Sequence, residues 1–223
     1  MSPKLSSHFV AFIDILGFSE MVKSDCESSD NPVFLERLYS AHNKAKQILG
    51  QDPDANLIQF SDSIVFSKPY SASSFEDFVS TVATWQRELL MSGLLCRGGI
   101  TFGKHFVDDK FLFSKAMIDA YHLESQQARY PRILISTDLL QLVKPKVYVN
   151  NLPLINEDDG VCFIDYITEN SEVPSNALES AVTRILNDTK SSSPSVQEKL
   201  RWLARYTDHK LNSNLSRPAF SKL

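Results

Sequence analysis

An apolar run near the N-terminus, over residues 9–16, is interrupted by a single carboxylate, Asp14. The run has the length and composition of a buried strand, and Gly17 ends it. A buried carboxylate costs several kcal/mol unless it is paired or holds a metal. No lysine or arginine stands near Asp14 in the sequence. We therefore expect Asp14 to meet a partner from elsewhere in the fold or to act as a ligand at the rim of a sheet.

The composition of the 223 residues is that of an ordinary soluble globular protein, with 43% hydrophobic and 22% charged residues. The net charge of -4 gives no reason to expect non-specific binding to nucleic acid or to a membrane surface. The three cysteines are scattered, which argues against a disulfide framework or a zinc site. The sequence has no signal-peptide core and no apolar run of membrane-spanning length. We expect a cytoplasmic protein.

Strand-like and helix-like segments alternate along the chain. Strands are expected over residues 9–16, 57–67 (two short strands of a hairpin), 94–106 and 132–136, with edge strands at 146–149 and 161–167. Helices are expected from residue 18, over 33–49, 74–93 and 115–130, and twice between 174 and 210. This order predicts an α+β sandwich of the βαββαβ, ferredoxin-like kind with C-terminal helices. We expect residues 1–170 to form the main domain and residues 171–223 a helical extension packed on it.

A second carboxylate, Asp62, stands at the tip of the predicted hairpin. In a βαββαβ sheet the first strand lies beside the hairpin, so Asp14 and Asp62 are expected at one end of the sheet. Two carboxylates that approach each other repel, unless a divalent cation lies between them. The alternative is that Asp14 caps a helix and that S-D-S is an ordinary turn.

The turn L-G-F-S-E follows the first strand and opens a predicted helix. Free backbone N–H groups at a helix start bind phosphate, and Gly17 allows a ligand to approach closely. The turn is therefore a candidate phosphate-binding element.

Four polar residues share one face of the helix predicted over residues 115–130: Lys115, Asp119, His122 and Gln126. Such a face is either solvated or functional.

The paired glycines of R-G-G, in the preceding strand, are most simply explained by a bulge.

These motifs resemble those of class III nucleotide cyclases. F-I-D-I-L-G-F-S is similar to their F-x-D-I-x-G-F-[ST] opening, and F-S-D-S-I-V-F to their second metal motif, with Ser61 in place of the usual glycine. C-R-G-G-I-T-F-G resembles their R-x-G-I-x-x-G strand, and K-A-M-I-D-A-Y-H-L-E occupies the place of their dimer-facing helix. The resemblance covers about residues 9–136, with the motifs in the family's order. It implies a class III cyclase-like fold, with residues 1–170 as the catalytic domain.

The sequence departs from adenylate cyclases at the positions that recognise the nucleotide. Their adenine-reading Lys and Asp match Ile58 and roughly Phe111, and their Asn and Arg on the dimer-facing helix fall near Ile118 and His122. A catalytically inactive nucleotide sensor is one explanation. The other rests on R-G-G, A-Y-x-L-E and Y-P-R-I, which look like the pyrimidine nucleotide cyclases of bacterial Pycsar anti-phage systems. An inactive enzyme is expected to lose its metal aspartates, and both remain.

The resemblance implies a lyase that converts UTP to 3',5'-cyclic UMP and pyrophosphate, a second messenger of anti-phage defence read by a separate effector protein. A cytidylate cyclase that makes cyclic CMP is the alternative. Two Mn²⁺ or Mg²⁺ ions per active site would be held by Asp14, Asp62 and the backbone carbonyl of Ile15. The partner of Asp14 would then be a cation and not a basic side chain. The backbone N–H groups of Phe18 and Ser19 would meet the triphosphate.

The resemblance also implies a homodimer with two composite active sites. Asp14 and Asp62 alone supply no positive charge for the transition state. Candidate catalytic donors from the partner chain are Lys115, His122 and Arg129.

The nucleobase is assigned from hydrogen-bond patterns. Uracil offers two acceptors around one N–H, so its pocket needs donors, for which the candidates are Arg97, Tyr39 and Tyr121. Cytosine needs an acceptor for its amine, for which the candidates are Asp119 and Gln59. Because no structural role is expected for Arg97, the sequence favours UTP over CTP.

Overall fold

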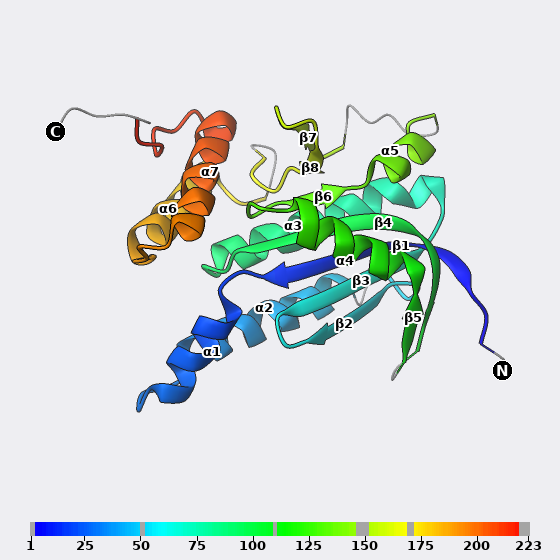
Figure 1. Cartoon of the computed structure of the whole chain (residues 1–223), viewed down its shortest axis with the longest axis horizontal. Helices are drawn as coiled ribbons and strands as arrows, with labels where there is room; N and C mark the ends of the chain where they lie inside the picture. Colours follow the sequence, from blue (N-terminus) through cyan, green and yellow to red (C-terminus); the bar gives the residue numbers. More distant parts are fainter. Residues whose placement is uncertain (1–2, 50–51, 109–110, 146–151, 169–171, 219–223) are drawn as a thin grey trace.

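The computed structural model describes residues 3–49, 52–108, 111–145, 152–168 and 172–218, and one twisted sheet runs through it (Figure 1). The strands are β1 (Ser6–Ile15), β2 (Asn56–Phe60), β3 (Ser63–Pro69), β4 (Cys96–Val107), β5 (Leu112–Ser114), β6 (Ile133–Ile135), β7 (Leu154–Asn156) and β8 (Cys162–Ile164). The helices are α1 (Phe18–Glu27), α2 (Val33–Leu49), α3 (Phe75–Met91), α4 (Lys115–Gln127), α5 (Thr137–Val143), α6 (Ser175–Asp188) and α7 (Pro194–Leu211).

The strand order is β2-β3-β1-β4-β6-β8-β7, and β5 pairs with the end of β4. β1 runs antiparallel to both of its neighbours, β3 and β4. Together with α1, α2 and α3, the first four strands form the predicted βαββαβ unit, and α6 and α7 are the predicted C-terminal helices. The α+β fold class is therefore confirmed.

Two expected edge strands have different outcomes. The strand predicted over residues 161–167 appears as β8, but it lies between β6 and β7, so its assignment as an edge was wrong. The outer position belongs to β7, which is only three residues long and too short to show a period of two. The strand predicted over residues 146–149 lies outside the described residues.

β1 explains the continuous apolar run, because both of its faces are covered. Phe9, Ala11 and Ile13 enter the main core together with residues of α2 and α3. Val10 and Phe12 face the other way and pack against alanines of α4. Asp14 ends this second face, under the C-terminal half of α4.

The paired glycines of β4 allow close approach of the backbone on both sides. The register with β1 runs without interruption through Gly98 and Gly99, so the bulge interpretation was wrong. A Cβ on Gly98 would lie 2.6 Å from the carbonyl oxygen of Phe12, and one on Gly99 would lie 2.6 Å from that of Ala120. The glycines therefore set the distance of β4 from β1 and from α4.

The two C-terminal helices pack against each other and against one end of the sheet (Figure 1). The hydroxyl of Tyr206, on α7, accepts hydrogen bonds from the backbone N–H groups of Tyr166 (3.0 Å) and Ile167 (3.1 Å). It donates one to Asp165 at 2.6 Å. These buried bonds fix α7 to the segment that leaves β8. None of the helices described is long and apolar enough to span a membrane.

Gly99→Ala is expected to lower the free energy of unfolding by about 1–3 kcal/mol, because the added methyl group overlaps the backbone of α4. Urea unfolding measures the change. Gly103→Ala is the matched control in the same strand, since its Cβ would meet Ala116 at an ordinary 3.5 Å. Equal losses in the two variants would contradict the close-approach explanation.

Candidate active site

Four ionisable side chains from four parts of the fold meet at one end of the sheet. Asp14 lies on β1, Asp62 in the β2–β3 turn, Arg97 on β4 and Glu124 on α4. Asp14 stands directly opposite Arg97 in the pairing of β1 with β4. The backbone N–H of Ile15 donates to the carbonyl oxygen of Asp62 at 3.0 Å, which holds the hairpin tip beside the end of β1.

The turn that carries Asp62 has an unusual backbone conformation. Ser61 has φ 54°, in the left-handed region that glycine adopts most readily. A serine in this conformation costs more than a glycine would, so the turn is held at some cost in strain.

Arg97 links two of the carboxylates. Its Nε donates a hydrogen bond to Asp14 Oδ2 at 3.2 Å and lies 2.7 Å from Glu124 Oε1. The expectations that no basic side chain pairs with Asp14 and that Arg97 has no structural role were therefore wrong. The partner is 83 residues away in the sequence and reaches Asp14 only through strand pairing.

The cluster holds more negative than positive charge. Burial raises the pKa of Asp14, Arg97 lowers it, and the neighbouring Asp62 raises it through both its charge and a hydrogen bond. Glu124 is 3% exposed, and burial raises its pKa to about 7 against the opposing effect of Arg97. The cluster thus contains three carboxyl groups and one guanidinium, which pairs with two of them.

The side chains present fit a divalent cation. The carboxyl groups of Asp14 and Asp62 interact directly, as the predicted convergence requires. Glu124 Oε1 is buried and forms an ion pair with Arg97 Nε, but the geometry is not that of a hydrogen bond, so the oxygen can still accept a donor or a cation. Among the described residues no three His, Cys, Asp or Glu side chains form a ligand set. A cation here would complete its shell with backbone carbonyl, water and phosphate oxygens, as Mg²⁺ commonly does.

The expected phosphate-binding turn lies next to this cluster in the chain. Gly17 has φ 78° and precedes the first residue of α1, Phe18, while Ser19 is exposed. The backbone N–H groups of the first turn of a helix have no partner within the helix. They are therefore available to a ligand near Asp14.

The four polar residues of α4 that the sequence singled out lie apart from Asp14 and Asp62 of the same chain. Lys115, Asp119, His122 and Gln126 line a cavity of about 360 Å³ beside β4 and α5, so the prediction of a shared face is confirmed. Lys115 Nζ lies 2.5 Å from Asp119 Oδ2. Tyr39 is 64% exposed on α2 and is likewise not part of the cluster.

Glu124 was not among the predicted site residues, although the sequence contains a signal for it. Residues 116, 120, 124 and 128 are spaced by four and are all buried; three of them are alanines and the fourth is Glu124. A glutamate in a stripe of small residues indicates an acid that is directed into the protein.

Among known proteins, only solved structures match this chain, and they show its fold. No family model and no curated protein matches the chain. Among solved structures, the adenylyl cyclase CyaB from P. aeruginosa superposes with a TM-score of 0.54 at 19% identity, over 74% of this chain and 96% of its own. The guanylyl cyclase domain of the RhoGC fusion protein from Blastocladiella emersonii superposes with a TM-score of 0.50 at 15% sequence identity. The match covers 74% of this chain and 98% of that domain.

A bacterial light-regulated adenylyl cyclase gives a TM-score of 0.54 at 14% identity, over 83% of this chain and 59% of its own. This chain has a class III cyclase fold. Within that fold, Asp14 and Asp62 lie on the first strand and on the tip of the following hairpin, which is the placement the sequence motifs predicted. The roles of individual residues are proposals.

Glu124→Gln is expected to remove a pH-dependent loss of stability. The pKa of Glu124 is about 7 in the folded protein, above its ordinary value of 4.5, so the folded state binds more protons between these values. Stability due to this group is therefore lost as pH rises through that window, by at most about 3 kcal/mol.

Urea unfolding of both proteins in EDTA at pH 5 and pH 8 measures this difference. The variant is expected to gain stability relative to the wild type at pH 8. Glu198→Gln, which removes an exposed carboxylate of α7, is the control and is expected to show no such gain. Parallel pH profiles for the wild type and Glu124→Gln would show that Glu124 is not held protonated.

Proposed function

We propose that this chain is a pyrimidine nucleotide cyclase that converts UTP to 3',5'-cyclic UMP and pyrophosphate. The observation that carries the proposal is the direct approach of Asp14 and Asp62 at one end of the sheet of a class III cyclase fold. Two carboxylates without enough neighbouring cations are costly for stability alone, but they suit a site that binds metal and triphosphate.

The reaction is an internal phosphoryl transfer. The ribose 3'-oxygen forms a bond to the α-phosphorus, the bond from that phosphorus to the bridging oxygen of pyrophosphate breaks, and the hydroxyl proton is released. Such a reaction needs in-line positioning and neutralisation of charge rather than covalent participation of the protein.

Asp14, Asp62 and the carbonyl of Ile15 would hold two Mn²⁺ or Mg²⁺ ions. Ions held there would supply a lower pKa for the hydroxyl and charge neutralisation for the phosphates. The backbone N–H groups of Phe18 and Ser19 would bind the phosphates at the start of α1. Arg97 would keep its contact with Glu124 when Asp14 turns to a cation, so the guanidinium stays fixed near the substrate.

The assignment of UTP now rests on different donors. Arg97 is occupied, which removes the original argument for it as a uracil reader. Of the acceptors proposed for cytosine, Gln59 is occupied by His42, and Asp119 pairs with Lys115 and would be freed only if Lys115 turned to the partner chain.

The tyrosine hydroxyls are still available as donors for uracil. Tyr121 packs edge-on against Phe12, with 5.4 Å between ring centres, on the face of β1 that ends in Asp14. Tyr39 is exposed on α2. The hydrogen-bonding groups that remain available therefore still favour UTP over CTP.

A homodimer would complete the site. The donors that we propose from the partner chain, Lys115 and His122, are exposed on α4 and do not contact Asp14 or Asp62 of their own chain. The third candidate, Arg129, lies 3.4 Å from Glu198, in an exposed pair that is easily broken. The protein would act in the cytoplasm, and its cyclic nucleotide would be read by a separate effector in anti-phage defence.

Product analysis tests the proposed activity. The wild-type protein is incubated with equal concentrations of ATP, GTP, CTP and UTP and with Mn²⁺, and the products are identified by chromatography and mass. Cyclic UMP is expected to predominate. Predominant cyclic CMP would reverse the choice of base, and cyclic AMP would overturn the pyrimidine assignment.

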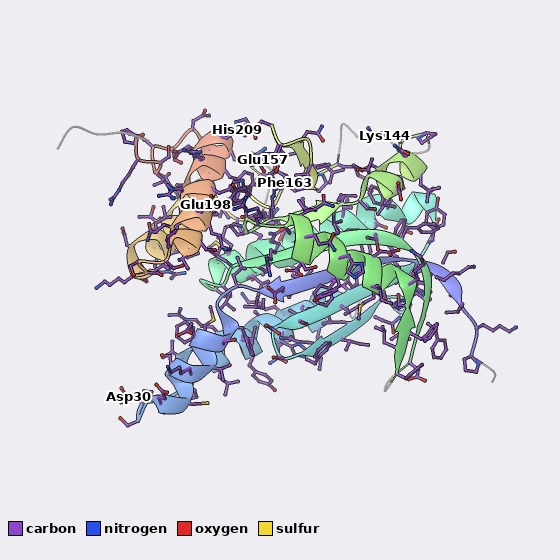
Figure 2. The ribbon with its side chains drawn as sticks, in the orientation of Figure 1. Asp30, Lys144, Glu157, Phe163, Glu198 and His209 are labelled. Atoms are coloured by element: carbon purple, nitrogen blue, oxygen red, sulfur yellow. The ribbon has the colours of Figure 1, made fainter. Side chains whose placement is uncertain are left out.

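Asp14→Ala and Asp62→Ala are each expected to reduce turnover at least about 100-fold, because each removes a proposed metal ligand. Circular dichroism and urea unfolding check that both variants fold. Asp30→Ala is the control, because Asp30 lies beyond the end of α1, at the tip of the projecting part of the molecule (Figure 2). Full activity in either site variant would exclude the two-metal site.

Mixing variants tests the composite site. An Asp14→Ala chain combined with a Lys115→Ala or His122→Ala chain is expected to regain activity, since one complete site forms per heterodimer. Co-purification with two different tags confirms that heterodimers are present. Their inactivity in every combination would contradict a contribution from the partner chain.

A further inference from the structure

A second polar cavity, of about 600 Å³, lies between α6, α7 and the segment that follows α7. Figure 1 shows this segment folded back beside the two helices. Three arginines line the cavity: Arg201 and Arg205, one turn apart on α7, and Arg217 on the returning segment. The residues that line it include no aspartate or glutamate.

The three guanidinium groups have no carboxylate partner among the described residues, as is also true of Arg37, Arg87 and Arg184. Arg97, Arg129 and Arg132 each pair with carboxylates. Across the described parts of the chain, no carboxylate lies within 4 Å of Arg201, Arg205 or Arg217. All three arginines are exposed, so their guanidinium groups are free to turn toward an anion in the cavity that they line.

The position of Arg217 is fixed by a network of hydrogen bonds. Asn212 ends α7 with φ 51°, which turns the chain back toward the helix. Asp208 then accepts hydrogen bonds from the Ser213 hydroxyl (2.7 Å) and from the backbone N–H groups of Leu215 (2.7 Å) and Ser216 (2.8 Å). These bonds anchor the backbone of the segment to α7, and the exposed Arg217 that follows lines the cavity together with Arg201 and Arg205.

The rest of the lining combines uncharged polar groups with an apolar surface. The uncharged polar residues are Thr183, Asn187, Gln197, Asn214 and Ser216, and the apolar ones include Leu186, Leu200 and Leu215. Guanidinium groups bind phosphate oxygens in pairs, and apolar side chains suit the face of a ring. The volume falls within the ordinary range of small-molecule sites.

We propose that this cavity, which we call the α6–α7 cavity, binds a phosphate ester of the size of a nucleoside monophosphate. The three arginines would hold the phosphate, and the apolar surface would hold the sugar or base. This site is separate from the proposed catalytic residues and does not depend on the proposed reaction.

The larger neighbouring cavity fits an anion less well. Arg201 and Arg205 also line that cavity, of about 750 Å³, on the side of β7 and β8. Its wall, however, carries Glu157 and Glu198 (Figure 2) as well as Asp158, which would repel a phosphate. Arg217 lines the α6–α7 cavity and not this one, so its substitution tells the two apart.

Isothermal titration calorimetry on the full chain tests the proposal. The probes are UMP, ribose 5-phosphate, inorganic phosphate and uridine, in EDTA so that no metal supports binding at Asp14 and Asp62. We expect UMP to bind best, ribose 5-phosphate and phosphate to bind more weakly, and uridine to give no measurable heat. Added salt is expected to weaken UMP binding.

Arg205→Gln and Arg217→Gln are each expected to weaken UMP binding about 10-fold, since each removes a charge-assisted hydrogen bond. Arg37→Gln, on the exposed side of α2, makes the same change in net charge and is expected to have no effect. Asp62→Ala is expected to bind UMP as the wild type does, which separates this site from the proposed catalytic one.

Three results would overturn the proposal. One is the absence of UMP binding by the wild type at millimolar concentration. Another is unchanged UMP binding by Arg217→Gln, which would place the ligand elsewhere. The third is equal affinity for UMP and uridine, or for UMP and inorganic phosphate, which would exclude recognition of a phosphate ester.

Discussion

The contact of Arg97 with Asp14 and Glu124 joins β1, β4 and α4 at one end of the sheet. It depends on the close approach of these elements, which Gly98 and Gly99 permit because neither carries a Cβ. Glu124 can then reach the sheet from the buried side of α4. The cluster contains three carboxyl groups and one guanidinium, and the excess of acidic groups would favour a bound cation.

Arg97 and a metal ion would compete for the same carboxylate. Asp14 accepts from Arg97 at one oxygen, Oδ2, while Asp62 approaches it as a second acid. A divalent cation between the aspartates would replace part of the interaction with Arg97 and leave the guanidinium with Glu124. The contact with Arg97 thus opposes the rise that burial causes in the pKa of Asp14 and orients its carboxylate, and a metal would have to displace it.

Much of the fold could be predicted from local patterns. β1, the hairpin around Asp62 and the helices α3, α4, α6 and α7 are long or strongly periodic, and they follow the predicted order. β7, of three residues, and the position of β8 inside the sheet could not be predicted, since both depend on pairing between distant segments. The partner of Asp14 could not be predicted for the same reason. Arg97 is its cross-strand neighbour but lies far from it in the sequence. Glu124 stood in a visible stripe of buried positions, but its direction toward Arg97 depends on how α4 crosses the sheet.

The central claim is that Asp14 and Asp62 form a metal site that works together with a bound triphosphate. Titration with Mn²⁺ followed by electron paramagnetic resonance, in the presence of a non-hydrolysable UTP analogue, tests it most directly. The wild type is expected to bind about two Mn²⁺ per chain, and the double variant Asp14→Asn, Asp62→Asn to lose this binding while remaining folded. Equal Mn²⁺ binding by the two proteins would contradict the account.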